Sequence, residues 1–211
     1  LICAFLGAAA IVALSSCSDT KPDPDTTTKD QISFKATVYS PSLETRGDGS
    51  LDSWNNTPVT FAKRTDMLSS FTEHWDASVT LYGLVVFAPI KTYGAGQTYS
   101  LKGYYPKVAT LNSNPDLVDF NIDGTTDIMV SDDIDPGTLN NQIPSPSTVT
   151  FRHLLSQFRI STENDEANPY PTALIKKIKI YAADAGDPLK NTAQLDLTTD
   201  VLTFGPLGGD M

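Results

Sequence analysis

The chain has little material for metal or nucleophile chemistry. Of its 211 residues only two are cysteines, Cys3 and Cys17, and only two are histidines. Past residue 17 the sequence therefore offers no thiolate for a disulfide, a zinc site or a cysteine nucleophile. Two histidines also leave little for a Ser-His-Asp triad. From these absences we expect a protein that is not an enzyme and that carries no cofactor.

Basic residues are scarce relative to acidic ones. The 15 Lys and Arg against 25 Asp and Glu give a formal net charge of −10. A protein that binds the phosphate backbone of a nucleic acid needs a basic face, so we expect no nucleic-acid partner. Charged residues make up only 19% of the chain and hydrophobic residues 40%, which is typical of a folded domain rather than of a disordered acidic tail.

The N-terminal residues 1–14 form an uncharged apolar run. The run is shorter than the roughly 20 residues that a membrane-spanning helix needs, and it is typical of a secretory signal peptide that has lost its basic start. It ends in Leu14-Ser15-Ser16-Cys17, the pattern of a bacterial lipobox, and so predicts acylation of Cys17. The alternative is an ordinary signal peptide with a chance cysteine. We assign residues 1–16 to a truncated signal peptide, and residues 17–30 to the lipidated cysteine and an acidic tether.

The remainder of the chain predicts β-strands. Residues 32–38 alternate strictly, with Ile32, Phe34, Ala36 and Val38 on one face and polar side chains on the other. Further short runs of β-branched and aromatic residues are separated by turn residues. These predict strands at 59–63, 79–88, 103–109, 117–122, 127–131, 148–161, 174–182, 193–197 and 201–204.

One segment, residues 66–74, predicts a helical turn instead. Asp66 would be its N-cap, with Met67, Phe71 and Trp75 on its apolar side. The strand spacing and the absence of long helical patterns predict an all-β fold, an antiparallel β-sandwich with Greek-key connections over residues 31–204. We expect residues 205–211 to begin a linker to a C-terminal domain that is missing from this sequence.

Asp119, Asn121 and Asp123, followed by Gly124, match the first half of an EF-hand calcium loop. A calcium loop also needs a bidentate Glu at its twelfth position, where this chain has Val130. We therefore predict a polar turn between two strands and keep the three residues only as a weak candidate metal site.

For the remaining polar residues that could carry chemistry, the sequence favours structural roles over catalysis. The acidic cluster Asp132, Asp133 and Asp135 predicts a solvated turn. His153 alternates inward along its strand and predicts a core histidine that is hydrogen-bonded to the backbone. If the protein bound glycans, the side chains stacking on the sugar would be Trp54, Trp75, Tyr104 and Tyr105.

Arg46 lies in a segment rich in Gly, Ser and Asp, residues 41–53, directly after the first predicted strand. Exposed segments of this composition are where proteases cut. Lys63-Arg64 is a competing basic site in or beside a strand. Arg46-Gly47-Asp48 also matches the integrin-recognition tripeptide, a short pattern that recurs by chance.

Several of these motifs follow one another in a recognisable order. The lipobox precedes the ISFKA strand, and Thr45-Arg46 comes next. Trp54, the apolar strand 81–89, Tyr104-Tyr105-Pro106 and Asp127-Ile128-Met129 follow. The order ends with the stretch Val149-Thr-Phe151-Arg-His153-Leu154-Leu155-Ser156-Gln157-Phe158 and with Leu195-Asp196-Leu197. Together they resemble the fimbrillin family of Bacteroidetes lipoproteins, the subunits of type V pili. The resemblance covers about residues 12–204, which corresponds to the signal and the N-terminal domain of family members.

The resemblance implies a structural or adhesive pilus component at the surface of the outer membrane. Its partners would be other pilus subunits, the outer membrane through the lipid anchor, and host or bacterial surface receptors. It further implies that a protease cuts after Arg46 and that the strand at 31–39 leaves, taking Ile32, Phe34, Ala36 and Val38 out of the core. A strand of another subunit then fills the groove. Two alternatives stay open: a pilus anchor or tip that keeps its first strand, and a surface glycan-binding lipoprotein.

Overall fold

The computed structural model describes residues 31–39, 53–95, 97–138, 141–142, 148–156 and 190–205, and within these ranges it is all-β. None of the described residues belongs to a helix that could cross a membrane. The strands are Lys35–Val38 (β1), Thr57–Arg64 (β2), Glu73–Val79 (β3), Val85–Phe87 (β4), Ser100–Tyr105 (β5), Leu117–Asn121 (β6), Met129–Ile134 (β7), Gly137–Thr138 (β8), Asn141–Gln142 (β9), Thr148–His153 (β10), Thr192–Asp196 (β11) and Val201–Phe204 (β12).

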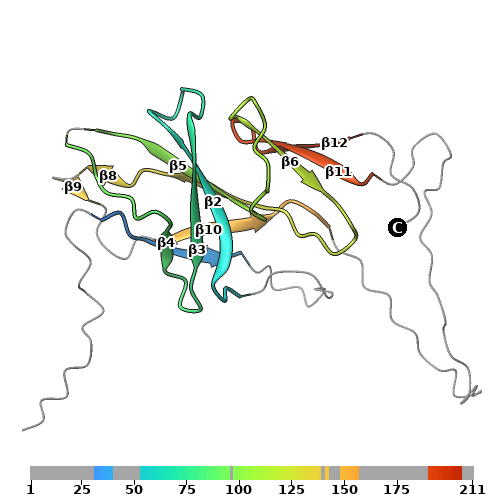
Figure 1. Ribbon diagram of the computed structural model, residues 1–211, viewed down its shortest axis with the longest axis horizontal. Helices are drawn as coiled ribbons and strands as arrows, with labels where there is room; N and C mark the ends of the chain where they lie inside the picture. Colours follow the sequence, from blue (N-terminus) through green and yellow to red (C-terminus); the bar gives the residue numbers. More distant parts are fainter. Residues whose placement is uncertain are drawn as a thin grey trace, which may run out of the picture.

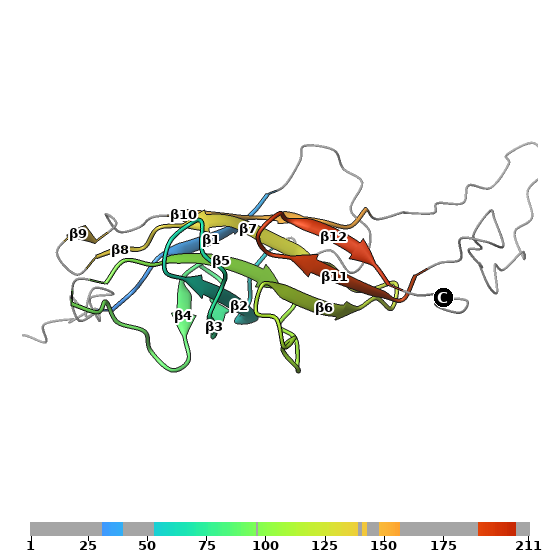
Figure 2. The ribbon, with the colours of Figure 1, turned by 90° about the horizontal axis from the view of Figure 1, so that it is seen from above.

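Two sheets make up most of the domain (Figures 1 and 2). The larger has seven strands in the order β1-β10-β7-β5-β2-β3-β4, and the smaller has three in the order β12-β11-β6. Within the larger sheet β2, β3 and β4 follow one another as antiparallel neighbours, and β5 returns to pair with β2. That spatial order is a Greek key, so the predicted all-β fold with Greek-key connections is confirmed.

The seven-stranded sheet closes on itself through β1, which lies beside β10 in Figure 1. On its other side, isolated bridges join Lys35 to Leu84 and Gln31 to Thr92, both antiparallel. A closed ring with an odd number of strands cannot alternate direction throughout, so one neighbouring pair must be parallel. That pair is β1 with β10. The prediction of a purely antiparallel sheet is therefore wrong at this one pair.

The apolar side chains form two separate cores. The first is enclosed by the ring and contains Ile32, Phe34 and Phe61. The second lies between the outer face of the ring and the three-stranded sheet, and it contains Tyr104 and Phe120. Because side chains alternate along a strand, β2 and β5 contribute to both cores.

Two predicted elements differ from the structure in kind, and others differ in their bounds, such as 103–109, which is strand only through Tyr105 of β5. The predicted strand 79–88 is a tight hairpin, in which Thr80–Leu84 turns between β3 and β4 and Gly83 adopts a φ of 78°. In the predicted helical turn, the Asp66 carboxylate does accept hydrogen bonds from the backbone N–H groups of Leu68 and Ser69. The helical turn does not extend to Trp75. That residue lies in the strand β3, which pairs along its length with β2.

Gly83→Ala tests the contact that closes the ring. A Cβ at this position would lie 2.7 Å from the carbonyl oxygen of Ala36 in β1, and the φ of 78° disfavours any side chain. The left-handed backbone alone costs an L-residue about 1–2 kcal/mol. We expect the free energy of unfolding, measured by urea denaturation, to fall by at least about that amount. The matched control is Gly94→Ala, whose Cβ would meet only the flexible end of Gln97. Equal stability of the two variants would contradict the close approach of β1 to the hairpin.

Candidate functional site

The segment 31–39, which contains β1 and is called the first strand from here on, is the candidate functional element, and its inward side chains are deeply buried. Ile32, Phe34 and Ala36 are 1–2% exposed, and Val38 packs against the same core from a half-buried position. The Phe34 ring makes edge contacts with Phe61 and Phe87, at centroid distances of 5.3 and 5.9 Å. Burying an aliphatic or aromatic side chain of this size stabilises a fold by roughly 1.5–3 kcal/mol. The strand is therefore an integral part of the first core.

The backbone of the first strand is hydrogen-bonded along both edges. On the side of β4, the N–H groups of Ile32 and Ala36 donate to the carbonyls of Lys91 and Gly83 at 2.9 and 2.7 Å, and Phe34 accepts from the N–H of Val85 at 3.0 Å. On the other side it pairs in parallel with β10, from Lys35 opposite Thr148 to Val38 opposite Phe151. Without β1 the ring would present two facing rows of unpaired backbone groups with an apolar floor between them. Such a groove is suited to bind another extended strand.

Sequence reasoning identified the inward side chains of β1 but missed the hairpin that holds its second edge. A signal was present, since Gly83 interrupts an otherwise β-branched and aromatic run. An isolated glycine inside a strand pattern indicates a bulge or a close approach of another backbone. Here it is the approach of β1.

The predicted lipidation site, Cys17, and the predicted cleavage site, Arg46, lie outside the described residues. The competing basic site is described: Arg64 is buried in β2, and its guanidinium lies 2.6 Å from the Asp133 carboxylate. A protease needs an extended, accessible chain, so the folded domain protects the bond after Arg64.

The acidic cluster is the predicted solvated turn only in part: Asp132 and Asp135 are exposed, and the Asp135 carboxylate accepts a hydrogen bond from the backbone N–H of Gly137, whereas Asp133 is held in buried ion pairs. Asp133 lies in β7, and besides Arg64 it contacts the buried Lys102, with 3.5 Å between the charged atoms. Lys102 also lies 2.6 Å from Asp200, in the turn between β11 and β12, and Asp200 in turn pairs with Arg152 of β10. These ion pairs connect the three-stranded sheet to the ring.

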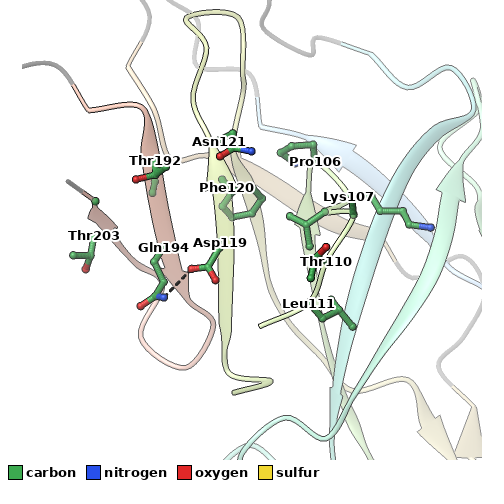
Figure 3. A pocket seen from close by; sticks show the side chains of 14 residues that line it. Pro106, Lys107, Thr110, Leu111, Asp119, Phe120, Asn121, Thr192, Gln194 and Thr203 are labelled. Atoms are coloured by element: carbon green, nitrogen blue, oxygen red, sulfur yellow. Dashed lines mark hydrogen bonds between the residues drawn. The ribbon is translucent and has the colours of Figure 1, made fainter. Parts of the chain in front are cut away.

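A groove of about 750 Å³ lies between the segment 106–111 and the three-stranded sheet (Figure 3). It holds two of the weak candidate metal ligands, Asp119 and Asn121. The Asp119 carboxylate accepts hydrogen bonds from the side-chain amides of Gln194 and Asn112, at 2.8 and 2.7 Å. In the described part of the chain no three His, Cys, Asp or Glu side chains are grouped so as to hold a metal ion.

The third weak candidate, Asp123, acts inside its own turn. Its carboxylate accepts hydrogen bonds from the N–H and hydroxyl of Thr125 and from the hydroxyl of Thr126. These bonds lower the pKa of Asp123 to about 2. The contacts are those of the polar turn that the sequence favours over a calcium loop.

The two histidines lie in separate polar contacts. His153 is hydrogen-bonded through Nδ1 to the Asp127 carboxylate at 2.9 Å, so the expected partner, a backbone group, is wrong. His74 lies between the hydroxyl of Tyr104, 3.0 Å from Nδ1, and the carbonyl of Pro115, 2.9 Å from Nε2. Because a carbonyl only accepts, the neutral ring carries its proton on Nε2 and accepts the Tyr104 proton at Nδ1. Burial lowers the pKa of His74 and raises that of Tyr104 to about 12.

The aromatic residues that a glycan site would use are largely enclosed. Tyr104 is fully buried, and Trp54 and Trp75 are 5% and 7% exposed. Tyr105 is half-buried and packs against the first core. Sugar rings stack on exposed aromatic faces, which these side chains do not offer.

Comparisons with known proteins give a distant structural likeness. No protein-family model matches this chain, and no curated protein sequence matches it. Among solved structures, the fold is similar to a crystal structure described as that of a "putative cell adhesion protein" from Bacteroides uniformis ATCC 8492. The identity is 11%, the TM-score is 0.44, and the match covers 87% of this chain and 69% of that one.

Phe34→Ala tests how much of the first core depends on the first strand, residues 31–39. The substitution removes a buried ring that contacts two other rings, and a change of this kind typically costs about 3–5 kcal/mol. We expect a loss of that size in the free energy of unfolding. The control is Phe204→Ala in β12, where the ring is 50% exposed and the cost should stay below about 1 kcal/mol. A small loss at Phe34 would show that β1 contributes little to the core.

The pKa of His74 predicts a dependence of stability on pH. Burial lowers the pKa in the folded state below the ordinary value of 6.5, so the unfolded chain binds more protons as the pH falls through 6.5. Stability is therefore expected to decrease on acidification from pH 7.5 to pH 5. In His74→Gln, which keeps a donor and an acceptor but does not titrate, the decrease should be smaller. Urea denaturation at both pH values measures it, and equal slopes for the two proteins would contradict the assignment.

Proposed function

We propose that this chain is a structural or adhesive component of a bacterial surface pilus. It is exported as a lipoprotein to the outer membrane and is assembled by strand exchange after its first strand is cut off. Its partners are other pilus subunits, the membrane through the acyl group on Cys17, and surface receptors. The observation that carries the proposal is the position of β1, which closes the ring between β10 and the β3–β4 hairpin.

Three properties of β1 support replacement by a strand from another chain. It is a strand of four residues, at the N-terminal end of the described domain. Its side chains belong to the first core alone, so the second core keeps all its members when β1 leaves. The groove offers both apolar sockets and backbone hydrogen bonds, which are the two components of binding by β-augmentation.

The glycan-binding alternative has less support. It relied on Trp54, Trp75, Tyr104 and Tyr105 as stacking surfaces, and these are buried or half-buried. The anchor or tip alternative differs only in whether β1 is retained.

The mature N-terminus distinguishes these possibilities. We expect mass spectrometry of fibres sheared from the cell surface to find chains that begin at Gly47, because cleavage after Arg46 releases the first strand. The matched variant Arg46→Ala should keep its N-terminus at an acylated Cys17, remain with the membrane and be absent from fibres. The control Lys63→Ala removes one residue of the competing basic site Lys63-Arg64 in β2. Because the fold already protects that site from proteases, this variant should mature like the natural chain.

Chains that begin at Cys17 both in fibres and in membranes would contradict strand exchange and favour an anchor or tip. A soluble monomer that never enters fibres would contradict the pilus role as a whole.

A further inference from the structure

The groove around the first strand offers sockets of different kinds to successive inward side chains. At Phe34 the socket is aromatic: the rings of Phe61 and Phe87 lie 5.3 and 5.9 Å from that of Phe34, and 5.5 Å from each other. All three contacts are edge-on, with interplanar angles of 64–83°, and aromatic rings in this arrangement attract one another beyond the effect of burial. This socket therefore favours an aromatic ring over an aliphatic side chain.

The next socket, at Ala36, is small. Ala36 is 1% exposed although its side chain is a single methyl group, so its neighbours cover it completely. It belongs to the first core and lies opposite Val149, which is also buried. Protein interiors are packed so closely that added carbon atoms push the neighbouring side chains out of position. Val38, in the following socket, is only half-buried, so a larger side chain there can extend toward solvent.

The register of the strand in the groove is also set at Ala36. Its N–H donates to the Gly83 carbonyl at 2.7 Å, and a Cβ at Gly83 would lie 2.7 Å from the Ala36 carbonyl oxygen. A slip by one residue would turn every inward side chain outward, and a slip by two would bring the aromatic ring to the small socket. The sockets are therefore read in a fixed order: apolar, aromatic, small and apolar.

Other segments of the same chain share the first half of this order and lack the second. Ile32 is followed two positions later by Phe34, and five further segments place an aliphatic residue in the same way before Phe61, Phe87, Phe120, Phe151 and Phe204. At the next alternate position these segments carry Lys63, Pro89, Ile122, His153 and Pro206. None of these residues is as small as alanine. The residue at position 36 therefore distinguishes the first strand from five similar segments of its own chain.

We propose that the groove selects its occupant by size at the Ala36 socket, and that it accepts strands with an aromatic residue followed two positions later by Ala or Gly. The inference rests on the strand exchange proposed above and names the class of strand that can take part in it. A groove that recognised alternation alone would also accept the five similar segments. A small socket rejects them because a larger side chain overpacks the first core.

Competition between peptides tests this selection. The full chain is cut after Arg46, and a fluorescent peptide of residues 31–39 is exchanged for the cut strand. We expect the unlabelled peptide with Ala36→Leu to compete at least about tenfold more weakly than the natural peptide. Phe34→Leu, which removes the edge contacts, should also compete more weakly. The matched control is Val38→Leu, which enlarges the side chain in the half-buried socket and should compete within about twofold of the natural peptide.

The same substitutions in the uncleaved full chain measure the sockets without any exchange. In urea, Ala36→Leu should lower the ratio of folded to unfolded protein at least about fivefold more than Val38→Leu does. Equal competition by the natural and Ala36→Leu peptides, or equal stability of the two uncleaved variants, would overturn the proposal. Failure of the natural peptide to replace the cut strand would instead contradict strand exchange, and the uncleaved variants would still decide whether the socket is small.

Discussion

The insertion of β1 between β10 and the β3–β4 hairpin is the constraint on which the first core depends. Its backbone satisfies hydrogen-bonding groups on two neighbours at once, and its side chains fill the interior between them. The inner strands β7, β5, β2 and β3 each pair antiparallel with a strand on either side. Among the described strands β1 alone joins β10 to the β3–β4 hairpin, so the enclosure of the first core depends on a strand in that place.

The second core has a different basis. It is covered by β6, β11 and β12, and its rim is held by the ion pairs that Asp200 makes with Lys102 and Arg152. Asp200 adopts a φ of 60°, a conformation that few residues other than Gly, Asn and Asp tolerate easily. Burying charges is unfavourable unless each has a partner, and Lys102 contacts both Asp133 and Asp200. The two sheets are therefore joined by buried ion pairs as well as by the apolar side chains of the second core.

Much of the fold could be predicted from alternation along the chain. The predicted strand 201–204 matches β12, and 193–197 and 117–122 differ from β11 and β6 by a residue. The inward set Ile32, Phe34 and Ala36 was equally visible, because a half-buried strand repeats every two residues. The hairpin at Gly83 was missed because apolar residues continue on both sides of the turn. The prediction of a helical turn that reaches Trp75 is wrong because the Asp66 cap bonds only the N–H groups of Leu68 and Ser69 and does not determine the conformation beyond that turn.

The candidate site could be predicted only in part. The first strand itself follows from local alternation, whereas the two edges that hold it are formed by residues far apart in the sequence. No local pattern shows that Lys102, Asp133 and Asp200 meet, or that Gly83 faces Ala36. The groove that β1 occupies is built from residues 83–91 and 148–151. Only the three-dimensional fold brings these two segments to either side of β1. The predictions for Cys17 and Arg46 rest on local sequence and concern residues outside the described ranges.

The separation of the two cores has a consequence for a chain that has lost its first strand. One half of its apolar interior would open to water, while the half beneath β6, β11 and β12 would keep its packing and its ion pairs. Such a molecule would have one empty strand position beside β10, in a domain whose second core keeps its side-chain contacts. Its cohesion and its readiness to accept a strand thus depend on opposite faces of the same strands, because β2 and β5 contribute side chains to both cores.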